Sequence, residues 1–152
     1  MRKILIIILF IILSIFIWTQ YRHFYRVADL TFTVWKRTDG YCYITPYAYW
    51  GFSSPKDDYI RASNIGQIDI YIDNDSTLLV FNSYHHLEYK NEIECYLRKY
   101  KYRHFEASPS YNDKSWELKR IKYRNNLPFI EINIREMNVS TNNSLRKRMN
   151  DS

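Results

Sequence analysis

LTFTVWKRTDGYCYI, residues 30–44, is the stretch of sequence that decides the fold. Apolar side chains alternate with the remaining ones on both sides of Asp39-Gly40, as expected for two strands that each bury one face. Aspartate and glycine tolerate the positive φ angles of the tight turns that join antiparallel strands. The stretch therefore predicts a β-hairpin.

The same alternation recurs further along the chain, next to clusters of turn-forming residues. It predicts a second hairpin around Asn74-Asp75-Ser76, a third hairpin around Asn125-Asn126, and a short additional strand between them. The segments expected to form these strands are Ile68–Asp73, Leu78–Phe81, Tyr102–Ala107, Trp116–Tyr123 and Pro128–Glu136.

The period of the apolar residues changes from two to three or four over residues 86–101, which predicts the main amphipathic helix of the domain. The apolar positions at this helical spacing are Tyr89, Ile93, Tyr96, Leu97 and Tyr100. Hairpins combined with one helix indicate an α+β fold, in which the helix packs on a small antiparallel sheet of about six or seven strands.

A different element precedes this domain. Ile4 to Trp18 are fifteen positions of aliphatic and aromatic side chains, interrupted only by Ser14 and preceded by Arg2 and Lys3. A helix of this length covers roughly 22 Å, against about 30 Å of bilayer hydrocarbon, so it is a marginal span. No Ala-x-Ala-like cleavage site follows, which favours an uncleaved signal anchor over a cleaved secretory signal. A buried core helix is disfavoured because a terminal helix that is apolar on every face is unusual in so small a domain.

Amphipathic side chains after the apolar run suit the lipid headgroup layer. They are Trp18, Tyr21, Arg22, Phe24, Tyr25 and Arg26. The sequence thus predicts a membrane helix that contacts the bilayer through residues 4–21 and ends its interfacial flank at residue 26. A globular domain over residues 27–137 and a disordered polar tail over residues 138–152 follow. Because a short basic tail before an apolar run is typical of exported chains, we expect the domain on the extracytoplasmic side.

Composition excludes several function classes. The chain has only three glycines, widely separated, which argues against phosphate-binding loops, and it contains no Gly-x-Ser-x-Gly nucleophile motif. Two cysteines, Cys42 and Cys95, are too few for a zinc site of their own; they form either one disulfide or, as we favour, two separate thiols. Residues 96–105 interleave rings and basic side chains, but an exported domain meets no nucleic acid.

Two carboxylate-rich segments are candidate cation sites. His85, His86, Glu88 and Glu92 are expected near the start of the predicted helix, where an exposed polar face explains them without a metal. Residues 73–77 offer several oxygen ligands but lack the glycine and the glutamate of a calcium-binding loop. We therefore predict no metal and no cofactor.

The strongest candidate for a binding site is a concentration of rings. Six aromatic residues crowd twelve positions, more than one sheet face can bury, and tyrosine and tryptophan dominate binding hot spots. The sequence therefore predicts a membrane-anchored, non-catalytic protein that binds another protein through Tyr47, Tyr49, Trp50 and Phe52. Two alternatives stay open. One is a tethered hydrolase or carbohydrate-active enzyme that pairs Asp57 or Asp58 with Glu88 or Glu92, and the other is a structural subunit of a membrane complex.

Overall fold

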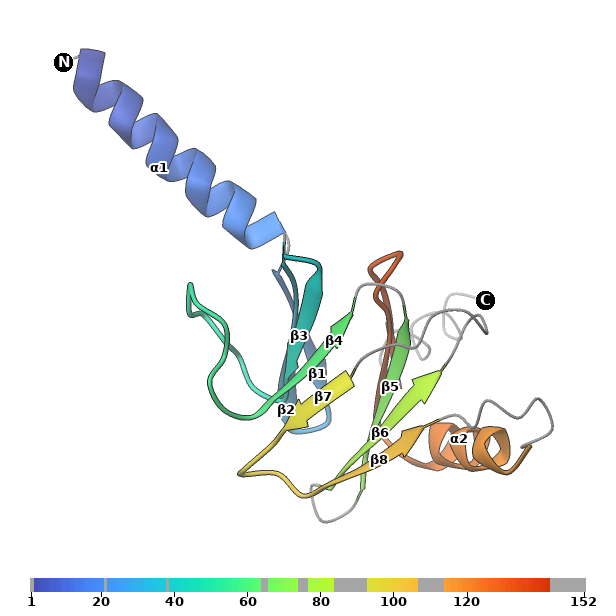
Figure 1. Cartoon of the computed structure of the whole chain (residues 1–152). Helices are drawn as coiled ribbons and strands as arrows, with labels where there is room; N and C mark the ends of the chain where they lie inside the picture. Colours follow the sequence, from blue (N-terminus) through green and yellow to red (C-terminus); the bar gives the residue numbers. More distant parts are fainter. Residues whose placement is uncertain are drawn as a thin grey trace.

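A computed structural model describes residues 2–20, 22–37, 39–63, 66–73, 77–83, 93–106 and 114–142. In this part of the chain, two helices and ten strands form an α+β structure. Helix α1 (Arg2–Gln20) extends away from a domain made of two five-stranded sheets and helix α2 (Lys114–Asn126), as Figure 1 shows. The α+β class predicted from the sequence is confirmed.

The first sheet, sheet A, is antiparallel throughout and has the strand order β1-β2-β3-β4-β7. Its strands are β1 (Arg22–Val27), β2 (Leu30–Lys36), β3 (Tyr41–Thr45), β4 (Tyr59–Ser63) and β7 (Ile93–Tyr96). The second sheet, sheet B, has the order β10-β9-β5-β6-β8, and of its described pairs only β6–β8 is parallel. Its strands are β5 (Gln67–Ile72), β6 (Leu78–Ser83), β8 (Tyr102–Glu106), β9 (Phe129–Asn133) and β10 (Asn138–Thr141).

The core lies between the two sheets. Because successive side chains of a strand point to opposite faces, every second residue of each strand enters this layer. Sheet A contributes Phe32, Val34, Cys42, Ile44, Ile60 and Ala62; sheet B contributes Ile68, Ile70, Leu78, Val80, Ile130 and Ile132. The antiparallel sheet expected from the sequence is thus split into two sheets that bury each other's inner faces.

Helix α2 covers the other face of sheet B. Phe81 and Phe129 of the sheet pack with Trp116 and Tyr123 of the helix, and Tyr71 is fully buried among them. Sheet B is therefore covered on both faces, which explains why β5 is buried at almost every position although its sequence alternates. The domain has three layers: sheet A, sheet B and α2.

Two predicted hairpins are confirmed. Strands β2 and β3 pair around Asp39-Gly40, and Gly40 has a φ of 88°, the left-handed conformation that the turn requires. Strands β5 and β6 pair as expected, and the Asp73 amide donates to the Thr77 carbonyl at 2.9 Å to close their connection. The predicted short strand near residues 102–107 is also present, as β8.

The prediction of a main helix over residues 86–101 is wrong for its second half. Residues 93–96 form β7, whose Ile93 and Cys95 point inward against Ile60 and Ala62 of β4. Ile-Glu-Cys-Tyr also alternates with a period of two, and contact with the sandwich core selects this period over the helical one. Residues 84–92 lie outside the described part of the chain.

The helix of the domain lies instead where the third hairpin was expected. Residues 114–126 form α2, because Trp116, Arg120, Tyr123 and Leu127 recur at spacings of four, three and four and meet sheet B on one side. The predicted second arm of that hairpin is confirmed as β9, which pairs with β5 and with β10.

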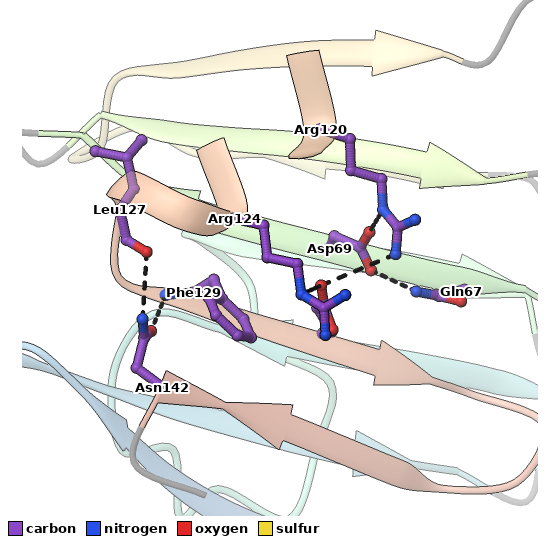
Figure 2. Close-up of polar contacts among 8 residues, drawn as sticks. Gln67, Asp69, Arg120, Arg124, Leu127, Phe129 and Asn142 are labelled. Atoms are coloured by element: carbon purple, nitrogen blue, oxygen red, sulfur yellow. Dashed lines mark hydrogen bonds and ion pairs between the residues drawn. The ribbon is translucent and has the colours of Figure 1, made fainter. Parts of the chain in front are cut away.

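The polar tail predicted to be disordered over residues 138–152 begins with ordered structure. Residues 138–141 form β10 at the edge of sheet B, and that part of the prediction is wrong. The amide side chain of Asn142 then accepts a hydrogen bond from the Phe129 amide and donates to the Leu127 carbonyl (Figure 2). This side chain ties the end of β10 to the α2–β9 connection.

Helix α1 makes few contacts with the domain, and twelve of its large apolar side chains are 50–69% exposed. Within the described residues, no helix combines the length and the apolarity that crossing a membrane demands, so the predicted membrane-spanning helix is not confirmed. The predicted boundary at residue 26 falls inside β1, which pairs with β2 along its whole length. The folded domain therefore starts at Arg22.

Cys42 and Cys95 are separate free thiols, in agreement with the favoured prediction. They lie on β3 and β7, with β4 between them. Two strand spacings amount to about 9 to 10 Å, beyond the roughly 7 Å that a disulfide can bridge between Cα atoms.

Candidate binding site

The outer face of sheet A carries a row of aromatic side chains that crosses four strands. Trp35, Tyr43, Tyr59 and Tyr96 come from β2, β3, β4 and β7, and successive ring centroids are 6.3, 5.7 and 5.7 Å apart. Trp35 pairs with Tyr43, and Tyr59 with Tyr96, directly across neighbouring strands. Cross-strand ring pairs of this kind stabilise a sheet.

Arginine side chains cover much of this row. The guanidinium carbon of Arg22 lies 3.9 Å from the Trp35 ring centroid, and that of Arg98 lies 4.9 Å from Tyr96. In such cation–π contacts the positive charge is attracted to the face of the ring, which stabilises the position of both side chains. Trp35 and Tyr43 are each only 7% exposed, so these two rings support the sheet and offer no free face to a ligand.

The connection between β3 and β4, residues 46–58, folds back over sheet A; we call it the aromatic loop. Thr33 holds it from below, since its hydroxyl donates to the Tyr47 carbonyl at 2.7 Å and accepts from the Tyr49 amide at 2.9 Å. Arg22 donates to the carbonyls of Tyr49 and Gly51 at 2.9 and 2.8 Å. The loop is therefore preorganised by side chains of β1 and β2.

The four predicted binding residues all lie on this loop, but they face two different environments. Tyr47 and Tyr49 contact each other edge to face, with centroids 6.2 Å apart, and line a groove beside the loop. Trp50 stacks on Phe24 of β1 at 4.4 Å and is 62% exposed, while Phe52 is 78% exposed. The structure thus separates the predicted site into a groove and a loop tip.

The groove, here called the tyrosine groove, has a volume of about 600 Å³. Tyr47 and Tyr49 donate their hydroxyls to the carbonyls of Asp57 and Ser53, at 3.0 and 2.7 Å. Burial, followed by neighbouring tyrosine and carboxyl groups, raises the pKa of Tyr47, and burial followed by Asp58 raises that of Tyr100. Its lining consists of Tyr47, Tyr49, Ser53, Ser54, Lys56, Asp57, Asp58, Lys99 and Tyr100.

Asp58 has a structural task at the base of this groove. It is buried, has a φ of 54°, and one carboxylate oxygen accepts the backbone amides of Arg98 and Lys99 at 2.7 and 2.8 Å. This contact joins the aromatic loop to the turn after β7. Asp57 is exposed and pairs with Arg98 at 3.3 Å. Asp57 and Asp58, the two candidates for one member of the predicted acid pair, are therefore both engaged. The candidates for the other member, Glu88 and Glu92, lie outside the described residues.

Figure 2 shows a second polar cluster, enclosed between sheet B and α2. Asp69 is 1% exposed, accepts a hydrogen bond from the side-chain amide of Gln67 at 2.8 Å and forms an ion pair with Arg120. Arg124 reaches Glu131 at 3.1 Å. Burial, followed by the charge of Asp69, raises the pKa of Glu131 above its ordinary value. Because α2 covers both carboxylates, this cluster fixes the helix on the sheet.

No group of three potential metal ligands comes together among the residues that the structure describes. The candidate segment with His85, His86, Glu88 and Glu92 lies outside those residues. Asp73, at the start of the second candidate, is exposed at the end of β5, and the turn residues 74–76 are not described.

The residues predicted for the lipid headgroup layer are distributed over the helix and β1. Arg22 is buried against Trp35 and Tyr49, and Tyr25 packs at the border of the core. Phe24 lies under Trp50, and Arg26 is exposed on the same face of β1. Trp18 belongs to α1, whereas Tyr21 lies outside the described residues.

Sequence reasoning missed the residues that shape the site from a distance. Arg22 and Thr33 position the loop, and Lys99 and Tyr100 complete the groove, although these residues are far apart in the chain. Thr33 and Thr45 are buried on the outer face of sheet A, and both hydroxyls donate to the Tyr47 carbonyl, but only the structure reveals their burial.

Comparison with known proteins gives no relative of this chain. No protein family, no curated protein and no solved structure matches it significantly.

Proposed function

We propose that this protein is a lipid-tethered binding protein, in which α1 is buried in a bilayer and the domain presents the tyrosine groove to a protein partner. The observation that carries the proposal is the surface of α1. Twelve apolar side chains between Ile4 and Ile17 point in all directions around the helix and stay half exposed or more. A helix that is apolar on every side needs an apolar environment on every side.

The magnitude of this effect supports lipid burial. Completing the burial of each half-exposed side chain contributes roughly 1 kcal/mol, so the twelve together contribute on the order of 10 kcal/mol. Water is therefore a poor environment for α1. The domain leaves this surface uncovered, because it meets the helix mainly through β1.

The apolar run is shorter than the hydrocarbon layer is thick, by roughly 8 Å. Short helices are accommodated when the bilayer thins locally or when flanking basic side chains reach up to the headgroups. Lys3 and Arg2 at one end of α1 suit this arrangement. The proposed location of the domain is the extracytoplasmic side.

The proposed binding function depends on the tyrosine groove. Its rings, ammonium groups and hydroxyls suit a polar segment of another protein, and the loop that bounds it is held in place before binding. An envelope accessory protein or an immunity-type protein that blocks a toxin at the membrane fits this description. Asp58 holds a turn and Asp57 is paired, which favours binding over acid–base catalysis.

The tether is tested by carbonate extraction of membranes from cells that express the full chain. We expect the protein in the membrane pellet, and we expect Ile8→Asp with Ile11→Asp to release it, because both side chains are exposed on α1 and the domain does not depend on them. Leu118→Asp is the matched control, since Leu118 on α2 is also an exposed aliphatic side chain, at 65% against 50% for Ile8 and 53% for Ile11. Release of the unaltered protein by carbonate would refute the tether.

The groove is tested separately by crosslinking the full-length protein in its own membranes and identifying the attached chains. Lys99→Ala and Tyr100→Ala should remove one specific crosslinked partner, whereas Tyr102→Ala, an exposed tyrosine outside the groove, should retain it. If the groove variants and the control retain the same partners, the groove is not the binding site. Partners lost only from the α1 variant would favour the alternative, a structural subunit assembled through its helix.

A further inference from the structure

We propose that the tip of the aromatic loop, Trp50 to Phe52, inserts beside α1 into the lipid leaflet nearest to the domain and forms a second lipid contact. This inference rests on the proposed burial of α1 in a bilayer. It assigns Trp50 and Phe52 to lipid and leaves Tyr47 and Tyr49 to the binding groove.

The first support is the position of Phe52 relative to α1. Figure 1 shows the connection between β3 and β4 extending from the domain on the side where α1 leaves it. Phe52 and α1 enclose an apolar groove of about 510 Å³. The side chains of α1 that line it are Ile6, Ile7, Phe10, Ile11, Ser14 and Ile15.

The depth of the tip follows from the geometry of the helix. Ile15 and Ser14, the lining residues nearest to the domain, precede the helix end at Gln20 by five and six residues. At about 1.5 Å per residue, this distance is roughly 8 Å along the axis. A bilayer that covers α1 up to its domain end therefore also covers Phe52, so the ring lies in hydrocarbon.

The chemistry of this apolar groove favours lipid over a protein partner. Ser14 brings the one hydroxyl among its lining residues, and this hydroxyl donates to the Phe10 carbonyl one turn earlier, at 2.8 Å. The remaining lining side chains are all hydrocarbon, so they present no donor or acceptor that would orient a peptide. Acyl chains fill such a surface without requiring hydrogen bonds.

The tip is also built rigidly enough to insert as a unit. Arg22 fixes the carbonyls on both sides of Trp50, and Phe24 stacks against the indole. Gly51 allows the tight approach of the Tyr49 ring, because a Cβ at this position would lie 2.3 Å from the Tyr49 hydroxyl oxygen. A preorganised loop loses little conformational entropy on insertion, and tryptophan is well suited to the interface between headgroups and hydrocarbon.

Fluorescence of Trp50 tests the inference directly. The purified full chain is reconstituted into phosphatidylcholine–phosphatidylglycerol vesicles whose acyl chains carry bromine near the headgroup, and the emission of Trp50 is obtained as the difference between the unaltered protein and Trp50→Phe. We expect the bromines to abolish most of this emission. Phe52→Asp should restore it, and Phe52→Leu should not; the ring is exposed, so neither change affects folding.

Flotation of the same vesicles separates the two proposals. Protein that floats with the vesicles while Trp50 emission stays unquenched would overturn insertion of the loop and leave the tether intact. Protein that does not float would refute burial of α1 and the inference together. Flotation of Phe52→Asp with loss of quenching is the result that supports the inference, because α1 alone then holds the variant.

Discussion

Asp69 of β5 and Glu131 of β9 face each other directly across two paired strands, and both carboxylates are buried beneath α2. Two like charges in such positions repel each other. Arg120 and Arg124, one turn apart on α2, reach down to them and offset the repulsion (Figure 2). The orientation of α2 on sheet B thus depends on a charge balance as well as on ring packing.

Asp69→Ala should lower the free energy of unfolding by about 3–5 kcal/mol, because it removes the buried carboxylate with which Arg120 pairs. Denaturant unfolding followed by circular dichroism measures this loss. Asp57→Ala is the matched control: it breaks an exposed pair with Arg98 and should cost at most about 1 kcal/mol. Equal effects of the two changes would contradict the structural role of the buried cluster.

Glu131 should make the stability of the protein depend on pH. Burial raises the pKa of Glu131 in the folded state above its ordinary value of 4.5, so the folded state retains this proton to a higher pH than the unfolded state does. As the pH rises from 4.5 through the folded-state pKa, the unfolded state ionises first and the free energy of unfolding falls. Glu131→Gln cannot ionise, so its stability relative to the unaltered protein should increase over this window. A difference that stays constant with pH would contradict the raised pKa.

Arg22→Ala should release the aromatic loop from sheet A. The change removes two charge-assisted hydrogen bonds to loop carbonyls and the contact with the Trp35 ring, at a cost of about 2 kcal/mol. Limited trypsin digestion should then cut faster after Lys56, within the loop. Arg22→Lys should behave similarly, because an ammonium group lacks the fork that reaches both carbonyls. Arg26→Ala, an exposed arginine of the same strand, should digest like the unaltered protein.

The two cysteines should remain reduced and unreactive. Burial raises the pKa of both thiols to about 12, so at mildly alkaline pH almost none is present as the reactive thiolate. A chromogenic disulfide reagent should report no fast thiol in the native protein and two in denaturant. Non-reducing mass spectrometry that showed a Cys42–Cys95 bridge would contradict the placement of β4 between their strands.

The sequence predicts local pairing well wherever a turn is short. Asp39-Gly40 and Asn74-Asp75-Ser76 connect strands that pair with their immediate neighbours, so alternation and turn chemistry suffice. Residues 93–96, predicted to be helical, form a strand, and residues 114–126, predicted to contain a strand, form a helix. Both segments are rich in rings and charges, and their periodic signals for helix and for strand are both weak. The sandwich core selects the strand in one case, and the open face of sheet B selects the helix in the other.

The sequence indicates the loop that carries the candidate site but not how the structure divides that loop. The density of rings between Tyr41 and Phe52 directs attention to this loop, because no single sheet face can bury so many rings. Its division into a groove and a tip depends on Arg22, Thr33 and Tyr100, which reach the loop from three other parts of the chain. Contacts over such sequence distances leave no pattern in a single sequence.

The join between α1 and the domain limits how far the protein can reach. Only one residue separates Gln20, the last residue of the helix, from Arg22, the first residue of β1. One residue extends at most about 3.6 Å, so no flexible linker separates the helix from the domain. In the proposed tethered state, a bound partner must therefore come to within the height of the domain above the lipid surface, and any pull on that partner is transmitted directly to the β1–β2 ladder.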